Sequence, residues 1–175
     1  MGGMKRYLLS VSALAVILSV SASPASAQER HYTVGLYGNS GISMGTGQGD
    51  TVILRSPIAA ELTVRTWTDI DPELVFSMGV RMELENTTAL AIVPRVEYMK
   101  VAAHWFRLRP FAGLPLFFMP FSMLGIEGGF SLDFHVGDFS IVLSAVVDAF
   151  IWGSEIPDGS TVLMFNGSVG FELEL

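Results

Sequence analysis

The stretch LVFSMGVRMEL, residues 74–84, alternates strictly between apolar side chains and others. Its even positions are all apolar, whereas the odd positions between them include Arg81 and Glu83. Successive side chains of a β-strand point to opposite faces, so this stretch predicts a strand with one wholly apolar face and one charged face. Residues 124–136 and 163–175 repeat the alternation, which predicts a sheet of such strands.

The amino terminus has the composition of an export signal. Lys5 and Arg6 precede an apolar stretch at residues 7–20, and the small residues Ala25-Ser26-Ala27 follow it. This order is typical of a cleaved secretory signal peptide. The apolar stretch is shorter than the roughly 20 residues that a membrane-spanning helix needs. We therefore expect residues 1–27 to be a signal peptide and residues 28–175 to form one exported domain.

Composition excludes several classes of protein. The chain has no cysteine, so it carries neither a disulfide nor a lipid anchor on cysteine. Without Lys5 and Arg6 it keeps 8 basic residues against 17 acidic ones, a net charge of −9, which argues against nucleic-acid binding. Only one of the remaining basic residues, Lys100, is a lysine. Soluble surfaces are rich in lysine and glutamate, so much of this surface is expected not to face water.

Eight strands are predicted after the signal, and no segment shows a helical period. They span residues 31–38, 57–67, 74–84, 89–99, 104–114, 124–136, 139–151 and 161–175. Short turns are predicted at 68–72, 100–103 and 137–138. Of the four connections on the other side, three are longer, at 39–50, which is rich in glycine, 115–123 and 152–160, and one, at 85–88, is short. Alternating short and long connections are typical of antiparallel barrels of the bacterial outer membrane, with the short turns on the periplasmic side.

Three observations favour an apolar face that points outward. Strands of about 11 residues match a tilted span of the hydrocarbon layer, and small residues on the polar face suit a narrow eight-stranded interior. The loop PLFFMPF, residues 115–121, suits a membrane interface, and we expect its phenylalanines to extend the lipid-facing belt. A soluble lipocalin-like periplasmic binding barrel, with the opposite orientation, is the alternative. The predicted lipid-facing residues include Leu74, Phe76, Met78, Val80, Met82, Leu84, Phe130, Leu132 and Phe134.

The chain resembles the small eight-stranded outer-membrane barrels, the group that includes the OmpA transmembrane domain and OmpX. Their last strand alternates and ends in an aromatic residue, which the insertion machinery reads. Val169, Phe171, Leu173 and Leu175 match the alternation, although the last residue is leucine. The resemblance implies an all-β, up-and-down transmembrane barrel in a Gram-negative bacterium. Its partners would be outer-membrane lipids and, during biogenesis, periplasmic chaperones and the barrel-insertion machinery, and the protein would be a monomer without metal or cofactor.

The polar face carries fourteen charged residues in this assignment, including Glu73, Asp133, Glu172 and Glu174. Arginine offers a planar fork of donors to carboxylates, so arginines without lysines predict a fixed ion-pair network. This network would fill the barrel, or would act as a gate if the barrel conducts. Its predicted members are Glu61, Arg65, Arg81, Glu83, Arg95, Glu97, Arg107, Arg109, Glu127 and Asp148.

Turn positions predict which of these residues are neighbours. A turn at 100–103 places Glu97 beside Arg107, Arg95 beside Arg109, and Pro94 opposite Pro110. Because proline lacks the ladder donor, we expect a bulge or weak ladder there. Further pairs are expected as well: Glu61 lies diagonal to Arg81, and Glu127 faces Asp148, which would make the latter pair a candidate cation or acid–base site unless an arginine intervenes.

A catalytic role is not expected. Ser131, Asp133 and His135 share one face, but successive members lie roughly 6 to 7 Å apart along an extended strand, too far for a hydrogen-bonded relay. The three histidines, His31, His104 and His135, all fall at predicted periplasmic ends, away from the outer leaflet where lipid A enzymes act. The predicted role is structural or surface interaction, with a narrow gated pore for small solutes or ions as the alternative.

Overall fold

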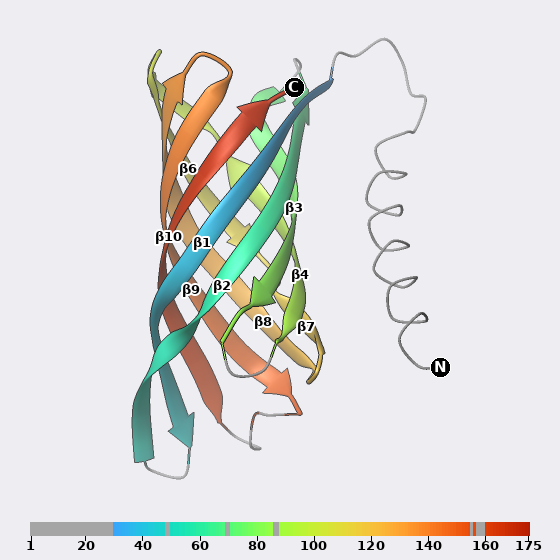
Figure 1. Cartoon of the computed structure of the whole chain (residues 1–175), viewed down its shortest axis with the longest axis vertical. Helices are drawn as coiled ribbons and strands as arrows, with labels where there is room; N and C mark the ends of the chain where they lie inside the picture. Colours follow the sequence, from blue (N-terminus) through green and yellow to red (C-terminus); the bar gives the residue numbers. More distant parts are fainter. Residues whose placement is uncertain (1–29, 48–49, 69–70, 86–87, 155, 157–159) are drawn as a thin grey trace, which may run out of the picture.

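The computed structural model describes residues 30–47, 50–68, 71–85, 88–154, 156 and 160–175. They form a closed cylinder of tilted antiparallel strands (Figure 1). The predicted signal peptide at residues 1–27 lies outside the described residues. Among the described residues, no helix has the length and apolarity needed to cross a membrane.

Ten strand segments build a ring of eight strands. β4 continues into β5, and β6 into β7, so each of these pairs makes one strand of the ring; β1 pairs with β10 and closes it. Every strand of the ring pairs with its neighbours in sequence, which confirms the predicted eight-stranded up-and-down barrel. The bounds are β1 Arg30–Gly47, β2 Asp50–Thr68, β3 Asp71–Glu83, β4 Leu90–Tyr98, β5 Lys100–Ala103, β6 Phe106–Gly113, β7 Leu116–Met119, β8 Met123–Val136, β9 Phe139–Gly153 and β10 Thr161–Glu174.

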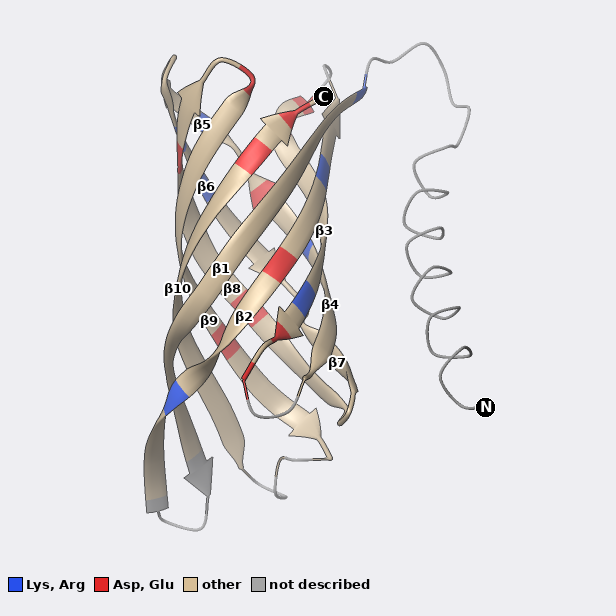
Figure 2. Ribbon diagram, viewed as in Figure 1, with Lys and Arg blue, Asp and Glu red and all other residues tan. Residues whose placement is uncertain are grey.

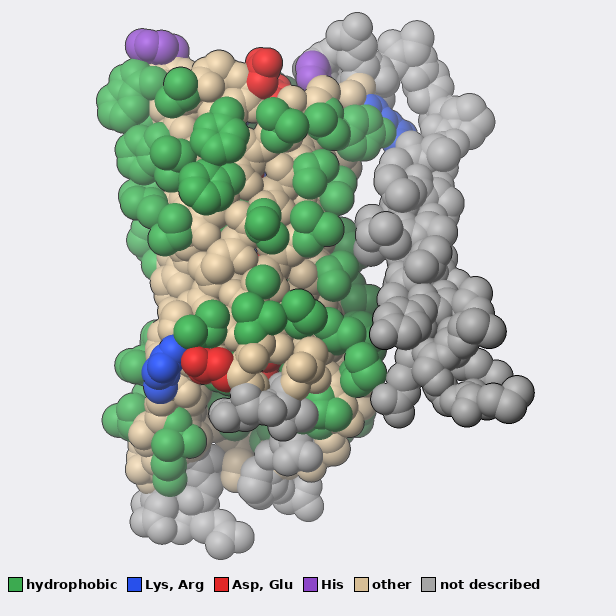
Figure 3. Space-filling model, in the orientation of Figure 1, with side chains coloured by type: hydrophobic (Ala, Val, Ile, Leu, Met, Phe, Trp, Pro, Cys, Tyr) green, Lys and Arg blue, Asp and Glu red, His purple; other side chains and the backbone are tan. Residues whose placement is uncertain are grey.

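The side chains of each strand alternate between the outside and the interior of the cylinder. On β3, Phe76 and Met82 are exposed, whereas Ser77 and Arg81 are buried. Hydrophobic side chains are spread over the visible wall from one end to the other (Figure 3). Of the residues predicted to face lipid, Phe76, Met82, Leu84 and Phe130 are exposed and Leu74, Met78, Val80, Leu132 and Phe134 are half-buried.

Apolar clusters lie in the interior near both ends of the barrel. We call the end where β1 begins and β10 ends the terminal end, and the opposite one the far end (Figure 1). At the terminal end, Trp67, Val75 and Met99 pack together. At the far end Phe117 and Phe150 meet edge to face, with ring centroids 5.6 Å apart. Phe117 is therefore inside the barrel, and the prediction that it extends the lipid-facing belt is wrong.

The predicted glycine-rich loop at 39–50 is mostly strand. β1 runs to Gly47, pairing with β10 as far as Thr46 and with β2 throughout, so the ladders on both sides satisfy its backbone groups. One register shift separates Asn39 from Gly41 on the β2 side. A Cβ at Gly41 would lie 1.9 Å from the carbonyl oxygen of Phe165, so glycine here permits close approach of two strands.

The predicted register between the fourth and fifth strands is wrong by four residues. The turn lies at residues 104–105, and the predicted turn at 100–103 is β5, which pairs with β6. As a result Arg95 faces Gly113 and Glu97 faces Phe111. Pro94 and Pro110 are not opposite one another. The ladder between β4 and β6 is nevertheless short: β4 contributes only Arg95–Glu97 to it.

Candidate functional site

The interior of the barrel is ionic between its two apolar ends. Charged residues occur along the height of the cylinder (Figure 2), and those at the strand centres are buried. Among the described residues, eleven charged side chains are buried, four arginines and seven carboxylates. They are Arg65, Arg81, Arg95 and Arg109, with Glu61, Glu83, Glu97, Glu127, Asp133, Asp148 and Glu172.

A terminal cluster lies nearer the terminal end and holds two arginines and three carboxylates. Arg65 on β2 pairs with Glu97 on β4, Nε to Oε2 3.0 Å, and with Glu172 on β10, Nη1 to Oε1 2.6 Å. Arg109 on β6 contacts the same two carboxylates, at 3.0 and 2.6 Å, and adds Asp133 on β8 at 3.0 Å. The two guanidinium groups therefore tie together five strands of the ring.

Two neutral side chains complete the terminal cluster. The Tyr37 hydroxyl donates to Glu172 and accepts from Arg65 Nη1 at 2.7 Å, and the Ser77 hydroxyl donates to Glu97. Tyr37 has room because Gly170 stands opposite it on β10. A Cβ at Gly170 would lie 2.1 Å from the tyrosine ring. Sequence reasoning missed Tyr37, since its part depends on a glycine in the neighbouring strand.

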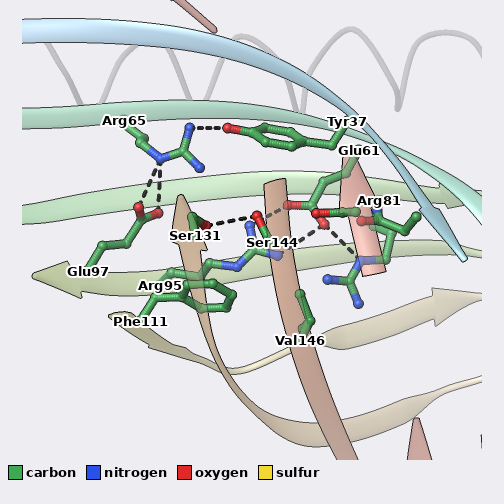
Figure 4. A pocket seen from close by; sticks show the side chains of 12 residues that line it. Tyr37, Glu61, Arg65, Arg81, Arg95, Glu97, Phe111, Ser131, Ser144 and Val146 are labelled. Carbon is green, nitrogen blue, oxygen red and sulfur yellow. Dashed lines mark hydrogen bonds and ion pairs between the residues drawn. The ribbon is translucent and has the colours of Figure 1, made fainter. Parts of the chain in front are cut away.

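A central cluster follows toward the far end, again with two arginines and three carboxylates. Figure 4 shows three of its members, Arg81, Arg95 and Glu61. Arg81 on β3 reaches Glu61 at 2.8 Å, Glu127 at 2.5 Å and Asp148 at 3.2 Å. Arg95 on β4 pairs with both Glu61 and Glu127. Because Glu127 and Asp148 belong to β8 and β9, these ion pairs cross the lumen.

The predicted neighbours are partly correct. Glu127 and Asp148 are direct cross-strand partners, as predicted, but Arg81 contacts both carboxylates and removes the basis for a cation between them. Glu61 lies directly opposite Arg81 rather than diagonal to it. Arg109 pairs with Glu97 rather than lying beside Arg95.

Two predicted members of the network stand apart from the clusters. Arg107 is half-buried and donates to Met99 Sδ at 3.6 Å, so its predicted place beside Glu97 is wrong. Glu83 is buried in the far half of the barrel, and no ion pair joins it to any residue that the structure describes. Both lie on the polar face of their strands, but neither makes an ion pair with a residue that the structure describes.

The three residues that resemble a catalytic triad, Ser131, Asp133 and His135, each contact a different partner. The Ser131 and Ser144 hydroxyl oxygens are 2.8 Å apart, and His135 Nδ1 lies 2.7 Å from the Ser140 hydroxyl oxygen. Asp133 pairs with Arg109. Within the described part of the chain, no hydrogen bond links the serine, the aspartate and the histidine, so the arrangement supports no proton relay.

The clusters leave little free volume. A cavity between them measures about 20 Å³ and is lined by Tyr37, Arg65, Arg81 and neighbouring side chains. Two further cavities, of about 20 and about 10 Å³, lie toward the far and terminal ends. A volume of this size admits about one water molecule.

Solved structures with a similar fold include two bacterial β-barrels. The β-barrel domain of Pseudomonas aeruginosa OprF aligns with a TM-score of 0.56 at 8% identity, covering 85% of this chain and 99% of that one. This chain has the fold of an outer-membrane β-barrel. Neisserial surface protein A gives the same values. At this identity the likeness concerns the fold alone. Neither a family model nor a curated protein sequence matches the chain.

Proposed function

We propose that this protein is a closed outer-membrane barrel with a structural or surface-interaction role. The observation that carries the proposal is the placement of side chains in the strands: the outer face exposes many large hydrophobic side chains, whereas eleven charged side chains of the described residues are buried inside. Lipid would cover the exposed hydrophobic wall. A soluble calyx needs the opposite arrangement, because its apolar ligand would lie inside.

Aromatic side chains at the terminal end support the membrane assignment. Trp105 stacks on Phe134, with ring centroids 6.2 Å apart, and Phe139 stacks on Phe171 at 5.6 Å. Rings of this kind gather at the boundary between lipid and water in membrane proteins. The final strand exposes Val169, Phe171, Leu173 and Leu175, the side chains that we propose as the insertion signal.

The far end offers a surface for interaction. The β1–β2 hairpin extends beyond the rest of the cylinder (Figure 1), because β2 pairs with β3 only from Ala59 onward. On its projecting part Val52, Ile53 and Leu54 are all more than half exposed. In the proposed orientation this hairpin stands on the extracellular side.

Fractionation of cells, followed by electrophoresis with and without boiling, tests the membrane role. The protein is expected in the outer-membrane fraction, running faster unboiled than boiled because the folded barrel is compact and resists detergent. Recovery of the protein in the soluble periplasmic fraction would refute the proposal and favour the calyx.

A narrow pore is the second candidate, because single arginine side chains stand between neighbouring cavities of the lumen. Arg81 lines both the central and the far cavity, and Arg65 lines both the central and the terminal one. Displacement of these two side chains would join the cavities along the lumen. Planar-bilayer recording separates the candidates: stable single-channel steps that change in Arg95→Ala or Arg109→Ala would support a pore, and a silent bilayer would support the closed barrel.

A further inference from the structure

The cavity at the far end has an unusual lining. Its volume is about 20 Å³, and its polar walls include Glu83, Ser56, Asn39 and Asn166, from four different strands. Phe117 also lines it, on the side of the apolar cluster. The cavity is separate from the ion-pair partners Glu127 and Asp148, neither of which lines it.

Polar groups of this cavity lack partners within the described part of the chain. Ser56 is 1% exposed and its Oγ makes no hydrogen bond, and Asn39 Nδ2 makes none either. The Glu83 carboxylate is buried without an ion pair. A buried polar group without a partner costs free energy, and a buried charge without one costs far more. The arrangement therefore calls for something that supplies positive charge and accepts oxygen ligands.

Arg81 also lines the cavity and attracts the Glu83 carboxylate, but no ion pair joins these two described side chains. Its Nε, Nη1 and Nη2 atoms are taken by Glu61, Asp148 and Glu127. The central cluster already has three carboxylates for its two arginines. Glu83 thus adds negative charge to an interior that is already negative.

We propose that this cavity binds a single hard cation, for which Ca²⁺ is the probe. Such ions take oxygen ligands, namely carboxylates, amide carbonyls, hydroxyl groups and water. Glu83 would supply the carboxylate, Ser56 the hydroxyl, and Asn39 and Asn166 their amide oxygens. Asn39 Nδ2 makes no hydrogen bond to a described residue, so the two ends of this amide can exchange places and its oxygen can face the ion. A water molecule alone would satisfy Ser56 and Asn39 but would bring no positive charge to the Glu83 carboxylate, which makes no ion pair with a described residue.

Titration of the detergent-purified protein with CaCl2 tests the proposal. Calorimetry should give one site per chain, with a Kd of about 0.1–1 mM, as for calcium sites with few charged ligands. At about ten times that Kd the melting midpoint should rise, because a ligand that binds only the folded state stabilises it. Choline chloride at matched ionic strength should leave the midpoint unchanged.

Two variants make the test specific. Glu83→Gln should abolish calcium binding and, in calcium-free buffer, melt no lower than the wild type, since the uncompensated charge is gone. Glu73→Gln is the matched control: Glu73 lies at the other end of the same strand and is exposed, so calcium should still raise its midpoint. A wild-type protein that binds no calcium, or a Glu83→Gln variant that still binds it, would overturn the proposal.

Discussion

Removal of the Arg95 charge from the central cluster, with side-chain size kept, should strongly destabilise the barrel. In Arg95→Met the unbranched stem remains, but Glu61 and Glu127 both lose an ion-pair partner. The cluster then holds one arginine against three carboxylates, a formal charge of −2 where the wild type has −1. Breaking a buried pair by removing one partner costs about 3–5 kcal/mol.

Asp148→Asn is the matched control because it changes the same cluster in the opposite direction. It leaves two arginines and two carboxylates, a neutral set, and the asparagine can still accept from Arg81 and lie beside Asn166. We expect its free energy of unfolding to lie within about 1 kcal/mol of the wild type, or above it. The expected difference in free energy of unfolding between the two variants therefore comes from the charge balance of the cluster, not from the loss of hydrogen bonds in general.

Equilibrium unfolding in urea measures both variants, with tryptophan fluorescence as the signal. For a slope of about 2 kcal/mol per molar, Arg95→Met should lower the midpoint by about 1.5–2.5 M. Asp148→Asn should shift it by no more than about 0.5 M downward. If Arg95→Met costs less than about 1 kcal/mol, or if Asp148→Asn costs as much as Arg95→Met, the assignment of charge balance as the stabilising factor is refuted.

Three further changes test other parts of the structure by the same unfolding measurement. Val147→Arg, on the exposed wall at the middle of β9, should lower the free energy of unfolding in lipid vesicles by about 2–4 kcal/mol. Val136→Arg, next to the terminal turn, should lower it by only about 0–1 kcal/mol. Equal losses would argue against a lipid-covered wall. Gly170→Ala should lower the free energy of unfolding by about 1–3 kcal/mol, because the new Cβ displaces Tyr37. Gly167→Ala, with open space around its Cβ, should lower it less, and the reverse order would contradict the packing described. Phe117→Ala should cost about 3–5 kcal/mol because the ring is buried against Phe150, and a cost near zero would mean that the ring does not pack inside.

The division of each strand into an apolar and a polar face could be predicted from sequence because it depends only on neighbouring residues. Positions 74–84 show the alternation by themselves, and a tight turn at 137–138 is enough to place Glu127 opposite Asp148. The length of the β1–β2 hairpin could not be predicted in this way. Glycines at 41, 45 and 47 indicate a loop in an isolated segment, but here the neighbouring strands satisfy the backbone on both sides.

The composition of the two clusters also lay beyond local reasoning. Arg109 reaches Glu172 on β10 and Arg81 reaches Asp148 on β9, contacts that exist only once the ring has closed. A four-residue error in one turn was enough to give Arg95 the wrong neighbour. The set of inward charges was predictable, but the partner of each charge was not, because long arginine side chains cross the lumen instead of following the ladder.

The same cross-lumen contacts explain how a barrel with a charged middle selects one closed form. Each buried arginine joins carboxylates from at least two other strands, and none is satisfied by its sequence neighbours alone. An open or misregistered sheet would leave these charges without partners in a low-dielectric interior, which is costly. The ionic clusters therefore act against incomplete closure, while the apolar clusters at the two ends supply the packing. On this reasoning, variants that break a cluster should populate partly open sheets, detectable as amide exchange along the β1–β10 seam, before they lose the remaining strands.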